Sequence, residues 1–171
     1  MKTNNAPVTD PCKALELLRD TGQRALAAHD ALSEAWRSLS VPDIATCCSK
    51  DDISLLRDLI RSRIYPINAF ELLARIDLSS AMQALLRWYL GKGVSPDTKF
   101  GGYTFELSTM LDDLNEIAGE NALRQLIHLD SFDRDRLDDP RVREAFCDAL
   151  DIAPQDFNGW LACSATSSSE T

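Results

Sequence analysis

The sequence predicts an all-α fold, and composition and punctuation both point to it. The chain of 171 residues holds 24 leucines and 19 alanines but only 9 isoleucines and 4 valines. Leucine and alanine favour helices, whereas β-branched residues favour strands. Capping residues, prolines and glycines divide the chain into segments of helical length. We therefore predict one all-helical domain over residues 10–163, between a disordered leader at 1–9 and a disordered Ser/Thr tail at 164–171.

The first predicted helix is long and spans residues 11–39. Asp10 suits the N-cap, and Pro11 suits the first helical position. Apolar and small residues then follow at alternating intervals of three and four. This spacing fits one amphipathic helix, or two helices broken near Gly22. Because Gly, Ala and His lie within the seam, packing onto the rest of the domain is favoured over a coiled coil.

Capping and stop signals predict the helices that follow. The motif Ser49-Lys-Asp-Asp52 resembles a capping box, and Tyr65-Pro66 ends the helix that it opens. Gly91 and Gly119 are stop signals for later helices. The predicted helices span residues 51–63, 70–77, 81–90, 104–118, 120–129 and 140–150, and a short last helix includes Phe157, Trp160 and Leu161.

A stretch of sequence recurs in the middle of the chain. Residues 54–66 align without gaps with residues 84–96. Both contain Leu-Leu-Arg, two apolar positions, three linker residues, a β-branched residue and a proline two positions later. A third, partial copy at 122–127 follows after 37 residues instead of 30. Repetition at this period is typical of stacked helical hairpins.

The end of the second copy and the loop after it carry a more specific pattern. The helix end Trp88-Tyr-Leu-Gly-Lys leads into Gly93-Val-Ser-Pro-Asp97, and Thr98-Lys-Phe-Gly leads to Gly102-Tyr-Thr104. This pattern resembles an ankyrin repeat junction, in which Gly-Ala-Asp-Pro-Asn follows an apolar helix and the hairpin loop closes with Gly-x-Thr-Pro-Leu-His. The resemblance covers only residues 53–129. Phe105-Glu106-Leu107 replaces Pro-Leu-His, and Arg63 stands where the earlier copy would have glycine.

The resemblance implies a short stack of helical hairpins, with the long N-terminal helix and a C-terminal helical cap at its ends. An irregular helical bundle is the alternative architecture. Ankyrin stacks bind partners through their hairpin tips and the first helix of each pair. The alternative for the two loop aromatics, Phe100 and Tyr103, is that they fold back over the core. The partner-binding residues that the resemblance implies are Tyr65, Asn68, Lys99, Phe100, Tyr103 and Glu106.

The distribution of charge indicates which classes of partner to expect. The formal net charge is −9, and residues 101–171 carry 15 acidic but only 5 basic side chains. An acidic surface repels nucleic-acid phosphates and anionic lipids, so neither nucleic acid nor a membrane is an expected partner. A basic protein is a better candidate. The alternative is that the acidic side chains only form a solvated face.

The cysteines and the N-terminus predict the compartment. An odd number of cysteines without a C-x-x-C motif predicts reduced thiols, with no disulfide framework and no zinc site. The N-terminus has no secretory signal, and no apolar run approaches the ~20 residues that span a bilayer. We therefore expect a cytoplasmic protein, with export by a signal-peptide-independent route as the alternative. The cysteines are Cys12, Cys47, Cys48, Cys147 and Cys163.

The sequence offers no recognisable catalytic or metal-binding cluster. His29 and His128 lie far apart and outside any ligand motif. Residues 133–144 superficially resemble an EF-hand loop, but Asp138 replaces its required glycine. Alternating arginines instead predict a loop of salt bridges that leads to a helix capped by Asp139. Cys147, within a predicted helix, is expected to be buried.

These observations predict a non-enzymatic protein without a cofactor. The favoured function is a protein–protein interaction module of the adaptor or effector type. The alternative is an acidic helical chaperone or immunity protein that neutralises a basic partner. An enzyme is the third possibility. It ranks below the other two because no acid, base and nucleophile occur at workable spacing.

Overall fold

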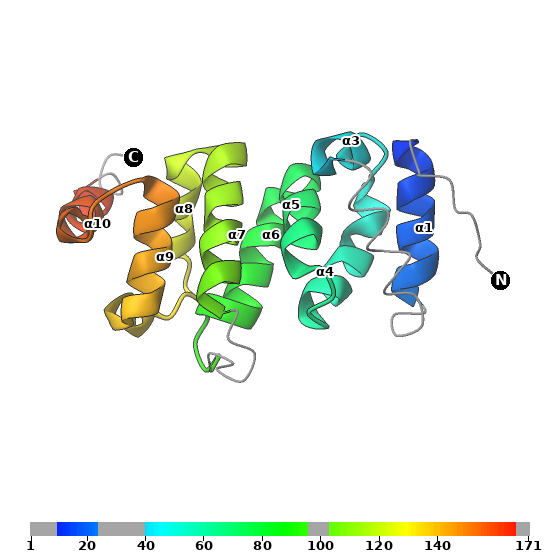
Figure 1. Cartoon of the computed structure of the whole chain (residues 1–171). Coiled ribbons are helices and arrows are strands. Elements are labelled where there is room, and N and C mark those ends of the chain that lie inside the picture. Colours follow the sequence, from blue (N-terminus) through cyan, green and yellow to red (C-terminus); the bar gives the residue numbers. More distant parts are fainter. Residues whose placement is uncertain (1–9, 24–39, 96–102, 167–171) are drawn as a thin grey trace. The chain divides into compact units, whose positions relative to one another are not determined.

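The described part of the chain is helical. The computed structural model describes residues 10–23, 40–95 and 103–166, and within these ranges all regular elements are helices (Figure 1). The all-α prediction is therefore confirmed there. The chain divides into two compact units, Met1–Ala81 and Met82–Thr171. The single domain over 10–163 stays a prediction. No helix among the described residues is long and apolar enough to cross a membrane.

The first unit begins with α1, whose start matches the prediction. Pro11 is its first residue, and the Cys12 backbone N–H donates to Asp10 Oδ1 at 3.0 Å. The predicted continuation of this helix over 24–39 lies outside the described residues. The elements of this unit are α1 (Pro11–Gln23), α3 (Val41–Ala45), a 3₁₀ turn (Lys50–Asp52), α4 (Ile53–Arg61), α5 (Pro66–Ile76) and the start of α6 (Leu78–Leu85).

The capping box before α4 is confirmed. Asp52 Oδ2 accepts from the Ser49 backbone N–H at 2.9 Å, and Ser49 Oγ accepts from the Asp51 N–H at 3.2 Å. The short helix α3 was not predicted, although Ser40 is its N-cap and Pro42 lies in its first turn. α5 begins at Pro66 instead of residue 70, because proline fits the first helical position as well as it ends the helix before it.

The core of the first unit lies between α4 and α5, which pack side by side (Figure 1). α1 adds two leucines to this core. Removing such side chains from water supplies the main stabilisation of helices this short, because isolated helices of this length are marginal. The buried residues on these helices and on α3 are Leu15 and Leu18 from α1, Val41 and Ile44 from α3, Leu56, Leu59 and Ile60 from α4, and Ala69, Phe70, Leu72, Leu73 and Ala74 from α5.

In the second unit, α7 (Tyr103–Ala118) and α8 (Glu120–His128) form a hairpin, and α9 (Pro140–Leu150) packs beside α7 (Figure 1). Gly119 has φ of +79° at the turn, which confirms the predicted stop. The Arg141 guanidinium lies over the Tyr103 ring at 5.6 Å, near the start of both helices. Asn115 Nδ2 donates to the Ala149 carbonyl at 2.9 Å, near their ends. α7 and α9 therefore run parallel.

The remaining elements of the second unit flank these helices. α6 continues into a π-helical turn (Leu86–Leu90), a 3₁₀ helix (Arg134–Asp138) precedes α9, and a 3₁₀ turn (Pro154–Asp156) leads to α10 (Phe157–Thr166). The Asp139 side chain caps α9 by accepting from the Arg141 N–H at 3.0 Å, as predicted. A hydrogen bond from Arg141 holds the pKa of Asp139 below its usual value.

An aromatic cluster joins α8, α9 and α10. The Phe146 ring lies 6.1 Å from the rings of both Phe157 and Trp160. Trp160 Nε1 donates to Glu120 Oε1 at 2.7 Å, and the Arg124 guanidinium lies 4.9 Å from the Trp160 ring. The hydrogen bonds from Trp160 and Arg124 lower the pKa of Glu120. The short last helix is thus held by ring packing and by a charged hydrogen bond.

The three recurring stretches agree in which side chains they bury. In each copy, the residue before the arginine and the two apolar positions after it are at most 5% exposed. The backbone also agrees where the sequence differs, because Arg63 and the aligned Gly93 both have positive φ, at +56° and +78°. The buried sets are Leu56, Leu59 and Ile60; Leu86, Tyr89 and Leu90; and Leu123, Leu126 and Ile127.

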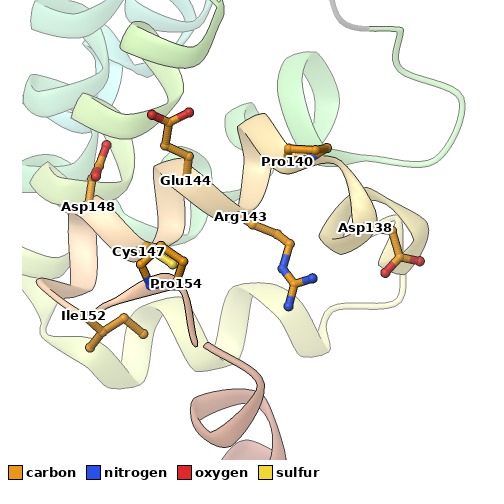
Figure 2. Close-up of a pocket in the computed structure, with 8 residues that line it drawn as sticks. All are labelled: Asp138, Pro140, Arg143, Glu144, Cys147, Asp148, Ile152 and Pro154. Carbon is orange, nitrogen blue, oxygen red and sulfur yellow. The ribbon is translucent and has the colours of Figure 1, made fainter. Parts of the chain in front are cut away.

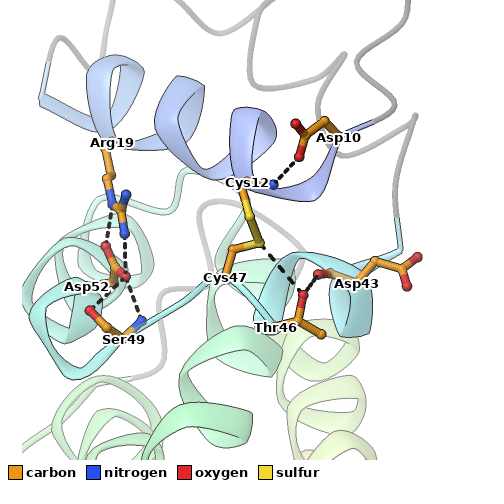
Figure 3. The surroundings of a disulfide bond; sticks show 8 residues. All are labelled: Asp10, Cys12, Arg19, Asp43, Thr46, Cys47, Ser49 and Asp52. Atoms are coloured by element: carbon orange, nitrogen blue, oxygen red, sulfur yellow. Dashed lines mark hydrogen bonds and ion pairs between the residues drawn. A yellow bond between two sulfur atoms is a disulfide. The ribbon is translucent and has the colours of Figure 1, made fainter.

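One prediction about the cysteines is wrong. Cys12 and Cys47 form a disulfide, with their Cα atoms 5.3 Å apart (Figure 3). α1 packs on α3 and α4, which brings its first turn beside the residues that follow α3. Cys48, Cys147 and Cys163 are not disulfide-bonded, and Cys147 is buried as predicted.

Candidate protein-binding site

Tyr103, predicted as an exposed contact residue, is buried. Its side chain is 4% exposed, its hydroxyl donates to the Tyr89 carbonyl at 3.0 Å, and the two rings are 5.8 Å apart. This burial raises the pKa of the Tyr103 hydroxyl. The expectation of an exposed anchor is therefore wrong for Tyr103, and the alternative, that it covers the core, holds. Lys99 and Phe100 lie outside the described residues.

The other predicted contact residues are half-buried and lie in different units. Glu106 Oε2 accepts a hydrogen bond from the Tyr89 hydroxyl at 2.9 Å, so Glu106 and Tyr103 both contact Tyr89. Tyr65 and Asn68 lie in the first unit, at the start of α5. Tyr65 has a left-handed backbone with φ of +47°. The structure thus groups Tyr103 with Glu106 and separately Tyr65 with Asn68.

Phe105, on the first turn of α7, is the most exposed large apolar residue among those described, with 69% of its surface accessible. Leu129 follows at 39%. In the sequence, Phe105 stands out only as a departure from the ankyrin pattern. The helical period of α7 contains the missed signal, because Tyr103, Leu107 and Leu114 share its buried face and Phe105 does not.

A groove of about 580 Å³ runs along α9 (Figure 2). Glu144 and Asp148 are exposed and one helical turn apart, and Figure 2 shows them on the same side of the helix. Arg143 lines the groove too, but its guanidinium lies 5.2 Å from the Phe157 ring and donates to Asn158. The lining residues are Asp138, Pro140, Arg143, Glu144, Cys147, Asp148, Ile152 and Pro154.

The chemistry of this groove suits binding better than catalysis. Cys147 is the potential nucleophile in it, but the residue is 5% exposed, and burial followed by the Asp148 carboxylate raises its pKa. The thiol therefore stays protonated near neutral pH, and a protonated thiol is a poor nucleophile. The groove combines the carboxylates of Glu144 and Asp148 with apolar Ile152 and Pro154.

Phe105 and the groove are connected through adjacent side chains. Ser108 lies one turn after Phe105 on α7, and its Oγ donates to Asp148 Oδ2 at 3.2 Å. Asp148 in turn lines the groove. An exposed aromatic ring and an acidic groove thus occupy neighbouring parts of the second unit. We call Phe105, Ser108, Glu144 and Asp148 the α7/α9 face.

The acidic residues before α9 form ion pairs and caps. Asp133 Oδ2 lies 3.7 Å from Arg136 Nε, and Asp139 Oδ2 lies 2.8 Å from Arg141 Nη2. The predicted loop of salt bridges is confirmed by these pairs. Within the described ranges, no group of three or more His, Cys, Asp and Glu side chains is placed to hold a metal ion.

The described residues thus form an all-helical fold in which an exposed aromatic ring lies beside an acidic groove. No protein-family model, curated protein or solved structure matches this chain.

Proposed function

We propose that this protein is a non-enzymatic protein–protein interaction module of the adaptor or effector type, built on an ankyrin-like stack of helical hairpins. The recurring buried positions support the stack, as does the shared left-handed backbone at Arg63 and Gly93. α7 and α9 run parallel, and α8 lies between them in the chain. This arrangement also fits the first helices of successive hairpins in a repeat.

The observation that carries the binding proposal is the exposure of Phe105. An aromatic ring held 69% exposed on a helix retains most of its unfavourable contact with water. When a partner covers such a ring, binding gains that contribution without reordering the core. Aromatic residues are frequent hot spots for this reason, each contributing ~2 kcal/mol or more. Phe105 replaces Tyr103 as the proposed anchor, next to the predicted contact residue Glu106.

Affinity capture from the native cell with three forms of the protein tests this proposal. We expect wild-type protein to retain a partner that Phe105→Ala loses. The matched control is Leu129→Ala, which removes an exposed apolar side chain 24 residues further along the chain. Capture should survive that change. Equal capture by Phe105→Ala and wild type, with both forms folded by circular dichroism, would reject Phe105 as the anchor.

A second candidate function is an acidic helical chaperone or immunity protein that neutralises a basic protein. The observation that favours it is the groove beside Glu144 and Asp148, in the part of the chain where acidic residues outnumber basic ones by 15 to 5. Charge complementarity of this kind accelerates association and makes it sensitive to salt. Both exposed carboxylates would then face cationic side chains of the partner.

The dependence of affinity on salt separates the two candidates. The acidic chaperone predicts a steep loss of affinity between low and physiological salt, and a smaller slope for the double variant Glu144→Gln/Asp148→Asn. Phe105→Ala should leave that slope unchanged. An affinity that stays constant over this salt range would reject the second candidate and leave the first in place.

A further inference from the structure

The feature that the proposed function does not use is the disulfide between Cys12 and Cys47. Cys12 lies on the first turn of α1 and is exposed, whereas Cys47 follows α3 and is half-buried. Figure 3 shows the bond joining the two segments within the first unit. The chain between them includes residues 24–39, so the bond closes a loop with a sequence separation of 35.

α1 has a second attachment near its other end. Arg19 Nε and Nη2 donate to the two carboxylate oxygens of Asp52 at 2.7 and 3.0 Å (Figure 3). Between the disulfide and this ion pair, Leu15 and Leu18 are buried. The Arg19 side chain is 43% exposed, so solvent weakens the ion pair. α1 has 13 residues, a length at which an isolated helix is marginal.

We propose that the Cys12–Cys47 pair is a redox-controlled clamp, which fixes α1 on α3 and α4 when oxidised and lets α1 detach when reduced. Opening needs a thiol or dithiol reductant from outside the chain. Its thiolate attacks the exposed Cys12 sulfur, and Cys47 leaves as a thiolate that takes up a proton. A second thiolate attacks the reductant's sulfur in this mixed disulfide and releases Cys12, which takes up a second proton. The protein gains two electrons, and the reductant leaves as a disulfide.

The neighbouring thiol does not open this bond by itself. Cys48 follows Cys47 directly, so internal exchange is the competing reaction. Burial and the nearby Asp52 carboxylate raise the pKa of Cys48 to about 11. Because the thiolate is the attacking species, Cys48 is a slow internal nucleophile near neutral pH. The bond therefore depends on the redox poise of the surroundings.

The state of the clamp would differ between the two locations that the sequence left as alternatives, the cytoplasm and the outside of the cell after export. Disulfides form and persist in oxidising compartments, whereas cytosolic thiols are kept reduced. In a reducing cytoplasm α1 would lose this covalent attachment and keep non-covalent ones such as its two buried leucines and the Arg19–Asp52 pair. After export by a signal-peptide-independent route, oxidation would lock α1 in place. The same chain would thus have a looser first unit before export than after it.

Thiol mapping and hydrogen exchange on the full-length protein test the clamp. Protein purified without reductant should give a linked Cys12–Cys47 peptide and no other disulfide-linked peptide. Addition of glutathione under native conditions should lower the exchange protection of α1 roughly 30-fold or more, leaving α7 and α9 unchanged. Reoxidation should restore the protection. The matched control, Cys163→Ser, removes an exposed cysteine outside the disulfide and should behave as wild type.

Three results would overturn this proposal. The first is alkylation of Cys12 and Cys47 as free thiols in unreduced protein. The second is a disulfide that glutathione cannot reduce under native conditions, because such a bond would be a permanent structural crosslink. The third is reduction without any change in α1 protection. Since each comparison uses wild-type protein, the test does not depend on whether a Cys12→Ser/Cys47→Ser variant folds.

Discussion

At the scale of single residues, Tyr103 and Phe105 are close in the sequence but differ strongly in burial. The two side chains are two positions apart, yet one is 4% and the other 69% exposed. The sequence predicted a helix from residue 104, which placed Tyr103 in the preceding loop. α7 in fact begins at Tyr103, and this single extra residue places its ring on the buried face of the helix. Boundaries are where periodicity is least informative, because end residues have neighbours on one side only.

The hydroxyl of Tyr103 should contribute measurably to stability. In Tyr103→Phe, the Tyr89 carbonyl loses its donor in a buried site, so the free energy of unfolding should fall by about 1 kcal/mol. Urea denaturation measures this change. Phe105→Ala is the control, and because its ring is exposed it should alter stability by no more than about 0.5 kcal/mol. A larger loss for Phe105→Ala than for Tyr103→Phe would contradict this assignment of core and surface.

The ion pair between Arg19 and Asp52 should make stability depend on pH on the acid side. Hydrogen bonds from Arg19 hold the pKa of Asp52 below its usual value. Burial of the carboxylate acts in the opposite direction, and the hydrogen bond from the Ser49 N–H lowers the pKa further. A carboxylate with a lower pKa in the folded state stabilises the fold above its unfolded pKa of about 4, and this contribution is lost as pH falls through the folded value. Asp52→Asn should therefore be less stable at neutral pH and show a flatter decline below pH ~4. Equally steep decline in both proteins would contradict it.

At the scale of helices, local signals predicted most starts and stops. Asp10, Ser49 and Asp139 each cap a helix as expected, and Gly119 ends α7. These features depend on neighbours within a few residues, which the sequence displays directly. α3 and the true start of α5 were missed, because proline was treated as a helix end when it also begins helices.

Gly91 should be essential to the junction after the π-helical turn. A Cβ built there would lie 2.2 Å from the Leu86 carbonyl oxygen, which is backbone and cannot rotate away. Gly91→Ala should therefore destabilise the protein by about 2 kcal/mol or more. Gly159→Ala is the matched control, since a Cβ there meets nothing within 4 Å and α10 should gain up to about 1 kcal/mol. Thermal unfolding of both variants checks this, and equal stability would contradict the clash.

At the scale of the whole molecule, the disulfide and the groove were missed because they depend on how the helices pack, which local sequence signals do not display. The Cys12–Cys47 bond follows from packing of α1 on α3 and α4, and spacing alone could not pair two of five cysteines. The groove arises where α9 meets the residues leading to α10. The acidic character of residues 101–171 was visible in the sequence, but the pairing of Asp133 and Asp139 with arginines shows that part of that charge is neutralised within the chain.

Hydrogen exchange of the complex with its captured partner tests most directly our proposal that the second unit binds a protein through the α7/α9 face. We expect slower exchange in the first turn of α7 and along α9 in the complex than in the free protein. Slower exchange confined to other helices, with these two segments unchanged, would contradict it.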